Sequence, residues 1–150
     1  MYVFLACGDG WAQHRSKCYR LFSDRLFWVD ARFSCEDHNA ILTSIPDAST
    51  NSFVTDLIKD ATQTWVLIVA RKFRGFFTWI DGTPWEYENW APGRPDDHLN
   101  IENCLNIYAN DNFKNGTTSF WNDLPCNGTS VNGFSGKRPY VCSRNVTTYN

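Results

Sequence analysis

The chain has 150 residues, a formal net charge of −2 at pH 7 and a hydrophobic content of 43%. This length and composition fit one globular domain with its own core. The charge is nearly balanced and no basic run stands out, so the sequence argues against binding to nucleic acid or to an anionic membrane surface. No apolar run approaches the ~18 residues of a membrane-spanning helix, so we expect no membrane insertion.

Six cysteines, an even number, indicate three disulfides and therefore an oxidising compartment. Zinc binding is not indicated, because the cysteines are not paired as Cys-x-x-Cys. Acceptor sequences for N-glycosylation occur at Asn115, Asn127 and Asn145. Together these features predict a secreted or extracellular glycoprotein.

The N-terminal part of the chain predicts a hairpin. Residues 1–6 are apolar but too short for the core of a signal peptide, and they lack a basic segment. They are either the remnant of a trimmed signal or an edge strand, and the residues leave both alternatives open. Residues 7–22 predict two strands, with the turn supplied by residues 8–10.

Residues 27–38 carry apolar side chains at helical spacing and predict an amphipathic helix. Ser23 or Asp24 would cap the start of this helix, and Asn39 would suit its end. A short strand is predicted over residues 40–45.

A second helix is predicted after Pro46, with Asp47 or Ser49 near its N-terminus. Its apolar face consists of Phe53, Val54, Leu57 and Ile58. Residues 64–70 then form a continuous apolar run, which is typical of a buried central strand.

The second half of the chain contains a long loop. Residues 75–80 predict a strand and residues 81–84 a turn, after which residues 85–93 lead into the loop. Such a loop inside a compact domain is unusual unless it is functional. The remaining predicted segments are a strand at 105–108, an exposed excursion at 109–119 and a closing strand at 139–142.

Three short clusters in this half offer side-chain oxygens, and each lies beside a proline or a cysteine that can fix the backbone. The clusters are Asp96-Asp97, Glu102-Asn103 and Asn122-Asp123. Calcium takes about six to eight oxygen ligands from carboxylates, amides and carbonyls. Asp96, Glu102, Asn122 and Asp123 have the chemistry that such a site requires, and the resemblance described next implies that they are the ligands of one calcium site.

These clusters resemble the C-type lectin domain. In that family a Glu-Pro-Asn or Gln-Pro-Asp triplet, a Glu before a cysteine, and a Trp-Asn-Asp sequence followed by a cysteine form the sugar-binding calcium site. The matching segments here are Pro95-Asp96, Glu102-x-Cys104 and Trp121-Asn122-Asp123-x-x-Cys126. The resemblance covers residues 7–143 and leaves residues 144–150 as a C-terminal tail. It implies an α+β C-type lectin-like fold, in which two helices pack on small antiparallel sheets beside a long functional loop.

The resemblance also implies a disulfide pattern, which counting alone does not provide. The implied pairs are Cys7–Cys18, Cys35–Cys142 and Cys104–Cys126. The peptide bond before Pro95 is expected to be cis. The family's auxiliary calcium site would place its ligands near Ala70 and Arg74, neither of which can serve, so that site is expected to be lost. Asp97 would then remain as a charged loop residue.

Arg94 departs from the family pattern, which has Glu or Gln at this position. Arginine has no acceptor atom and keeps its proton. In one interpretation its guanidinium folds over Asp96 and Glu102 and replaces calcium as their counter-charge. In the other, Arg94 points into solvent and a weakened calcium site survives.

The triplet also bears on the sugar. Asp96 in its third place favours the galactose-type pattern. His98 stands where some galactose binders of the family carry a tryptophan that stacks on the sugar, but the favoured interpretation of His98 is a solvated loop histidine. Trp121 is interpreted as a core residue rather than as a sugar platform.

These observations predict a secreted, calcium-dependent carbohydrate-binding module that binds a glycan or a glycoprotein. The predicted ligand-binding residues are Arg94, Asp96, His98, Glu102, Asn122 and Asp123. The alternative is a calcium-independent, protein-binding module in which Arg94 replaces the metal. We expect no enzyme, because the sequence contains no nucleophile elbow, His-Glu-x-x-His motif or phosphate loop. Oligomerisation is left open.

Overall fold

The computed structural model describes residues 4–61, 64–112, 114–126 and 136–149. The N-terminal half contains β1 (Phe4–Ala6), β2 (Ala12–His14), β3 (Lys17–Leu26), α1 (Trp28–Glu36), β4 (Ile41–Leu42), α2 (Ala48–Ile58), β5 (Trp65–Phe73) and β6 (Phe76–Trp79). The C-terminal half contains the 3₁₀ turn η1 (His98–Asn100), β7 (Cys104–Tyr108), β8 (Trp121–Leu124), β9 (Arg138–Asn145) and β10 (Thr147–Tyr149).

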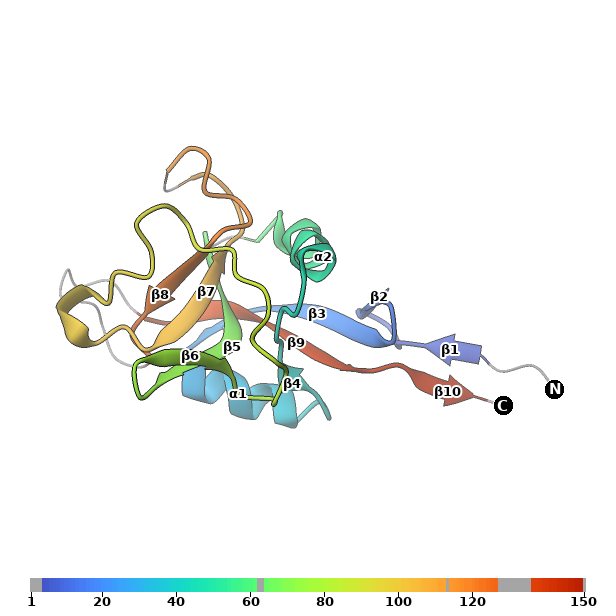
Figure 1. Ribbon diagram of the computed structural model, residues 1–150. Coiled ribbons are helices and arrows are strands. Elements are labelled where there is room, and N and C mark those ends of the chain that lie inside the picture. The colour runs from blue at the N-terminus through green and yellow to red at the C-terminus, as the bar shows by residue number, and fades with distance from the viewer. Residues whose placement is uncertain (1–3, 62–63, 113, 127–135, 150) are drawn as a thin grey trace.

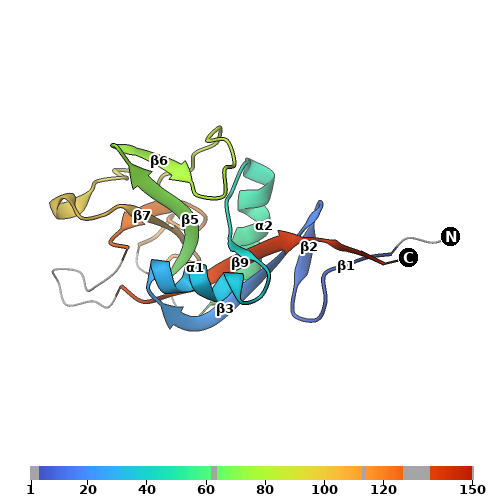
Figure 2. The same ribbon diagram turned by 90° about the horizontal axis from the view of Figure 1, so that it is seen from below.

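Eight strands form one sheet around the long strands β3 and β9. The order is β2-β3-β9-β5-β7-β8, with β4 added to β9 and β6 added to β5. All pairs are antiparallel except β5 and β9, which meet in a single parallel contact. Helices α1 and α2 lie on opposite sides of the β3–β9 ribbon (Figures 1 and 2). The α+β fold class expected from the resemblance is confirmed.

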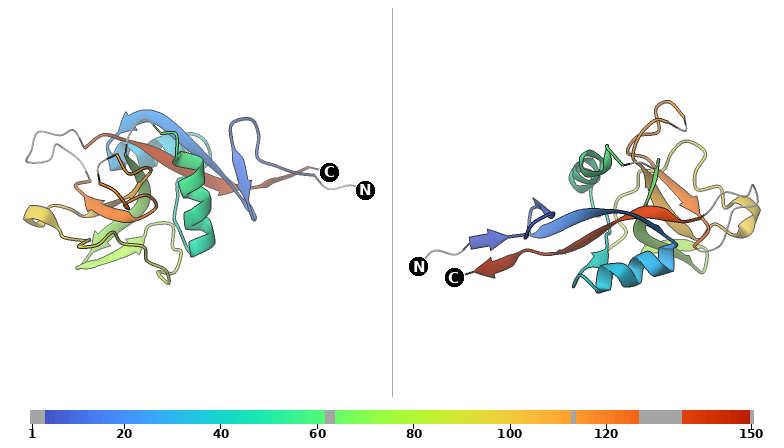
Figure 3. Two further views of the ribbon diagram at one scale, coloured as in Figure 1. Left: turned by 90° about the horizontal axis from the view of Figure 1, so that it is seen from above. Right: turned by 180° about the vertical axis from the view of Figure 1, so that it is seen from behind.

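The N-terminal hairpin is formed by β2 and β3, and its turn is at Arg15 and Ser16. The predicted turn at residues 8–10 is therefore not the turn of this hairpin, although the backbone does turn there. Strand β1 pairs with β10 in a separate two-stranded sheet. This pair extends away from the body of the domain, and Phe4 pairs with Tyr149 at its tip (Figures 1 and 3).

Helix α1 buries Trp28, Ala31 and Cys35 against the sheet. The predicted caps Ser23 and Asp24 are wrong, because both residues belong to β3, whose pairing with β9 reaches Leu26. Phe27 is the N-cap residue instead, and it makes no side-chain cap hydrogen bond. Asn39 follows the helix with φ +53°, the left-handed conformation that commonly ends a helix.

Helix α2 has the predicted cap at Asp47. The Asp47 carboxylate accepts a hydrogen bond of 2.8 Å from the Thr50 N–H. This bond, followed by the contact with Arg15, lowers the pKa of Asp47 to about 2. Val54 and Ile58 are fully buried, while Phe53 and Leu57 pack at the margin of the core.

Replacing Asp47 by alanine is expected to lower the free energy of unfolding by ~1 kcal/mol at neutral pH, the usual effect of losing a helix cap. Because the folded-state pKa is depressed, this stabilisation is present above the unfolded pKa near 3.8 and is lost as the pH falls towards 2. Denaturant unfolding at pH 7 and pH 2 tests this, with Asp47→Asn as the uncharged control. An equal difference between wild type and Asp47→Ala at both pH values would contradict the assignment.

Trp121 is the central aromatic residue of the core. It is 0% exposed, and its ring makes edge-on contacts with Trp79, Trp85, Tyr87 and Trp90 at centroid distances of 5.4 to 6.0 Å. Its indole Nε1 donates a hydrogen bond of 2.7 Å to Asn51 Oδ1. The prediction that Trp121 is a core residue is confirmed, and this core anchors the start of β8.

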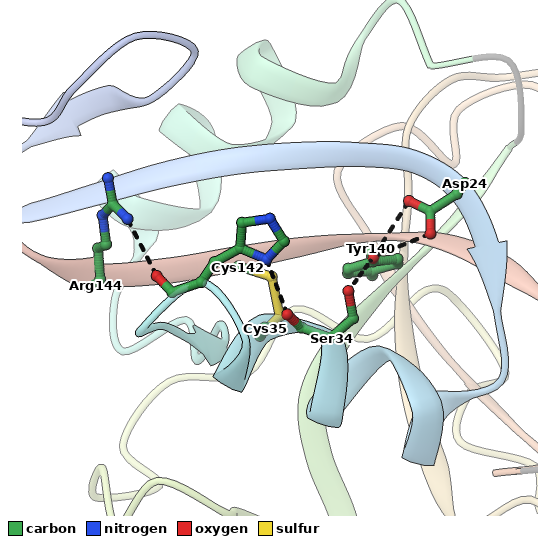
Figure 4. Close-up of a disulfide and its surroundings, with 7 residues drawn as sticks. Asp24, Ser34, Cys35, Tyr140, Cys142 and Arg144 are labelled. Atoms are coloured by element: carbon green, nitrogen blue, oxygen red, sulfur yellow. Dashed lines mark hydrogen bonds between the residues drawn. A yellow bond between two sulfur atoms is a disulfide. The ribbon is translucent and has the colours of Figure 1, made fainter.

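The three disulfides are those that the resemblance implied: Cys7–Cys18, Cys35–Cys142 and Cys104–Cys126. Beside the second bond, α1 is tied to β3 and β9 through polar side chains (Figure 4). The Tyr140 hydroxyl lies 2.7 Å from Ser34 Oγ and donates to the Asp24 carboxylate at 3.2 Å. Asp24, predicted as a cap, thus binds β9 instead.

Candidate functional site

The loop between β6 and β7 is held against β8 by backbone hydrogen bonds. Trp121 N–H donates to Asn89 O at 2.7 Å, and Ala91 N–H donates to Trp121 O at 2.9 Å. These bonds place the loop beside the two residues that follow Trp121, which are Asn122 and Asp123. The peptide bond between Arg94 and Pro95 is cis, as expected. The loop carries η1 at the end of the domain opposite the β1–β10 pair (Figure 1).

Three of the four predicted calcium ligands come together at this loop. Asp96, Glu102 and Asp123 each place one carboxylate oxygen within 4.8 Å of the others. Asp123 is fully buried and accepts from the N–H groups of Asp96 (3.2 Å) and Asp97 (2.7 Å). Glu102 accepts from the His98 N–H at 2.9 Å. The loop backbone is therefore wrapped around two of the carboxylates.

The electrostatics of this cluster favour a bound cation. Burial, the hydrogen bond with Asp96 and the charge of Asp123 raise the pKa of Glu102 to about 8. Burial also raises the pKa of Asp123. Neighbouring carboxylates repel one another, so the charged form of each is disfavoured unless a positive charge is present. The cluster has the oxygen donor set that calcium prefers.

Asn122, the fourth predicted ligand, precedes Asp123 on β8. Its Nδ2 donates to Asn106 Oδ1 at 3.1 Å, which fixes the orientation of the amide. Its Oδ1 is buried and has no hydrogen-bond partner within the described residues. Buried polar atoms normally have partners, so an orphaned amide oxygen in this position fits a ligand that the protein alone does not provide.

Arg94 forms an ion pair with Asp96, through its Nη1 and the Asp96 Oδ2. Both side chains are partly exposed, at 29% and 38%. Among the described residues Arg94 makes no ion pair with Glu102. The guanidinium of Arg94 therefore acts as the counter-charge of Asp96, as in the first interpretation, but not as the counter-charge of Glu102.

The rest of the loop differs from the sequence interpretation in one respect, at Asp97. His98 is exposed, and beside it Leu99 and Ile101 are exposed at 57% and 41%. Asp97 is more than a charged loop residue, because it is ion-paired with Lys72 at 2.9 Å. Sequence reasoning missed Lys72, since it lies in a strand outside every motif.

The remaining predicted residues can be placed as follows. Asn115 and Asn145 are exposed, whereas Asn127 lies outside the described residues. At the two auxiliary-site positions, Ala70 is fully buried and Arg74 is exposed at the β5–β6 turn. Within the described part of the chain, neither helix is long and apolar enough to cross a membrane.

A disulfide-braced α+β domain, with carboxylates gathered on a long loop beside a cis-proline, has the architecture of a C-type lectin-like domain. The family model described as "Lectin C-type domain" matches residues 24–144. The chain belongs to this family.

Two curated relatives and one solved structure illustrate the similarity. The galactose-specific lectin nattectin of Thalassophryne nattereri is 29% identical over 145 residues, covering 94% of this chain and 82% of nattectin. The versican core protein of Rattus norvegicus is 34% identical over 119 residues, which are 79% of this chain but 4% of versican. The carbohydrate-recognition domain of cow CD23, solved in the presence of a GlcNAc2Man3 oligosaccharide, is 29% identical with a TM-score of 0.77, covering 96% of this chain and 99% of that domain.

Proposed function

We propose that this chain is an extracellular carbohydrate-binding module that uses one calcium ion and has no catalytic role. The observation that carries the proposal is the convergence of three carboxylate oxygens within 4.8 Å. Asp96, Glu102, Asn122 and Asp123 would hold the ion. When bound, calcium would offer its remaining coordination positions to the hydroxyl groups of a sugar.

The sugar class follows from the triplet and from one relative. Asp96 occupies the place that favours galactose-type sugars, and nattectin is described as galactose-specific. The exposed side chains of His98 and Leu99 lie next to the site in the chain and are available to the apolar face of a sugar ring. We therefore propose galactose or a galactose-terminated glycan as the ligand.

Arg94 supports a second candidate function, a protein-binding module without metal. Its ion pair with Asp96 uses one of the carboxylates that calcium would need. In that function the guanidinium stays in place and the loop contacts a protein partner directly. The two candidates differ in one measurable property, which is the response of the protein to calcium.

We expect calcium to raise the melting temperature reversibly, since an ion that binds only the folded state stabilises it by about 2.7 kcal/mol at a hundredfold excess over Kd. In Arg94→Gln the calcium Kd should fall by up to about fivefold. The reason is that the partly exposed ion pair with Asp96, which contributes up to about 1 kcal/mol, no longer competes with calcium for that carboxylate. Calorimetric titration with calcium followed by EDTA measures both effects.

Arg15→Gln is the matched control, because it removes a similar partly exposed ion pair, with Asp47, away from the site. It should leave the calcium Kd unchanged. The sugar is tested by retention on immobilised galactose and mannose, with elution by EDTA. If the wild type does not respond to millimolar calcium, the calcium-dependent function is wrong and the protein-binding function takes its place. A response in Arg94→Gln alone would then show that Arg94 occupies the place of the ion.

A further inference from the structure

Lys72 is a nearly buried cation that belongs to β5 but reaches the site loop. Its side chain is 15% exposed, and its Nζ lies 2.9 Å from Asp97 Oδ2. The same ammonium lies over the Phe77 ring, 5.4 Å from the centroid. The Lys72 N–H donates to Asn103 O at 2.7 Å, so the backbone of this residue is fixed as well.

Asp97 connects this lysine to two of the calcium ligands. Its Oδ1 accepts from the Glu102 N–H at 3.1 Å, and its own N–H donates to Asp123 Oδ2 at 2.7 Å. Asp97 also has φ +44°, a left-handed conformation that is uncommon for residues other than glycine. The contact with Lys72 is therefore made at the junction on which the loop geometry depends.

The charge balance explains why a cation is needed at this point. Asp97 is hydrogen-bonded to the Glu102 backbone and to the Asp123 carboxylate of the cluster, and Arg94 is already paired with Asp96. A carboxylate that is partly removed from water is stabilised by a positive charge beside it. Within the described residues, Lys72 is the cation that forms an ion pair with Asp97.

We infer that Lys72 is a positioning residue for the site, a fixed internal cation that holds Asp97, and through it Glu102 and Asp123, in the binding arrangement before any ion arrives. The loop is then ordered without metal, and calcium does not have to supply the free energy for ordering it. The claim that the ordered loop prepares a calcium site rests on the proposed function. The claim that Lys72 orders the metal-free loop does not.

The test uses the metal-free protein first. In Lys72→Met, which keeps the stem over Phe77 but removes the charge, the Asp97 and Glu102 amides should exchange with deuterium at least about tenfold faster in EDTA. Lys72→Arg should restore most of the protection. Lys59→Met, which removes an exposed lysine paired with Asp56, is the matched control and should leave both exchange rates unchanged.

A second variant keeps the inference testable if Lys72→Met folds poorly. Asp97→Asn retains an acceptor for the Glu102 N–H but removes the negative charge, and it should raise the same exchange rates. In the Lys72→Met/Asp97→Asn double variant the rates should increase little beyond those of either single variant, because both changes break one ion pair. Unchanged amide exchange in Lys72→Met and in Asp97→Asn overturns the inference.

Calcium affinity is the second readout. Lys72→Met should weaken calcium binding by about 10- to 100-fold, the usual effect of losing a group that orients metal ligands. A wild-type protein that binds no calcium would refute the proposed function, while the exchange rates in EDTA would still decide the role of Lys72. Fast exchange in Lys72→Met with an unchanged calcium Kd would overturn the claim that Lys72 prepares the site.

Discussion

Replacing Trp121 by alanine is expected to lower the free energy of unfolding by about 3–5 kcal/mol, the largest effect of any substitution considered. The ring is fully buried and contacts four other aromatic rings, so its removal leaves a cavity. The change also removes the donor to Asn51 Oδ1, which leaves a buried acceptor without its partner. Denaturant unfolding with the disulfides intact measures the loss.

Two further variants separate the contributions at this position. Trp121→Phe keeps most of the packing but removes the donor to Asn51, and it should be destabilised by about 1–3 kcal/mol. Phe33→Ala removes an aromatic ring that is 58% exposed, and its effect should stay within about 0.5 kcal/mol. If Trp121→Ala lost no more stability than Phe33→Ala, the central place of Trp121 in the core would be refuted.

Replacing Asp123 by asparagine is expected to weaken calcium binding by at least about 100-fold, since removing a ligand exceeds the effect of removing a group that orients one. Asparagine retains one acceptor for the two N–H groups that Asp123 binds, but its amide NH2 faces the other N–H. Calcium-dependent retention on galactose should be lost with the calcium. Calorimetry and the galactose matrix measure the two effects.

Asp111→Asn is the matched control for this change. Asp111 also accepts from two backbone N–H groups, those of Thr117 and Thr118, but it lies in the loop between β7 and β8. Its substitution should leave the calcium Kd unchanged. If Asp123→Asn retained the wild-type Kd, the buried carboxylate would not be a ligand and the proposed position of the ion would be wrong.

The features that the sequence predicted correctly depend on local residue types or on the resemblance. The disulfides, the cis bond at Pro95 and the buried Trp121 all belong to motifs that match the family. The Asp47 cap is a contact over three residues, so chain order alone indicates it. The convergence of Asp96, Glu102 and Asp123 was also anticipated, because their spacing matches a known site.

The features that the sequence did not predict depend on strand pairing between distant segments. Ser23 and Asp24 have the chemistry of a helix cap, but pairing with β9 extends β3 past them. Tertiary pairing here overrides a local preference. Lys72 meets the loop next to a register shift in the β5–β7 pair between Ile68 and Arg71. Periodicity within one strand contains no information on such a shift.

The sequence also did not decide whether Arg94 pairs with a carboxylate of the site or points into solvent. The residue types allow a guanidinium to pair with Asp96 or with Glu102, and both carboxylates are close to it along the chain. The backbone of the loop decides, because it places Asp96 within reach of Arg94 while Glu102 binds the His98 N–H.

The pairing of β1 with β10 has a practical consequence for presenting this domain. Phe4 and Tyr149 pair at the tip of one ribbon, and the site loop lies at the other end of the molecule (Figure 1). Immobilising the protein through either end on a sensor surface or a bead therefore leaves the loop facing the solution. Fusing either end to a trimeric scaffold would display several sites outward together, and the resulting avidity makes weak individual binding measurable.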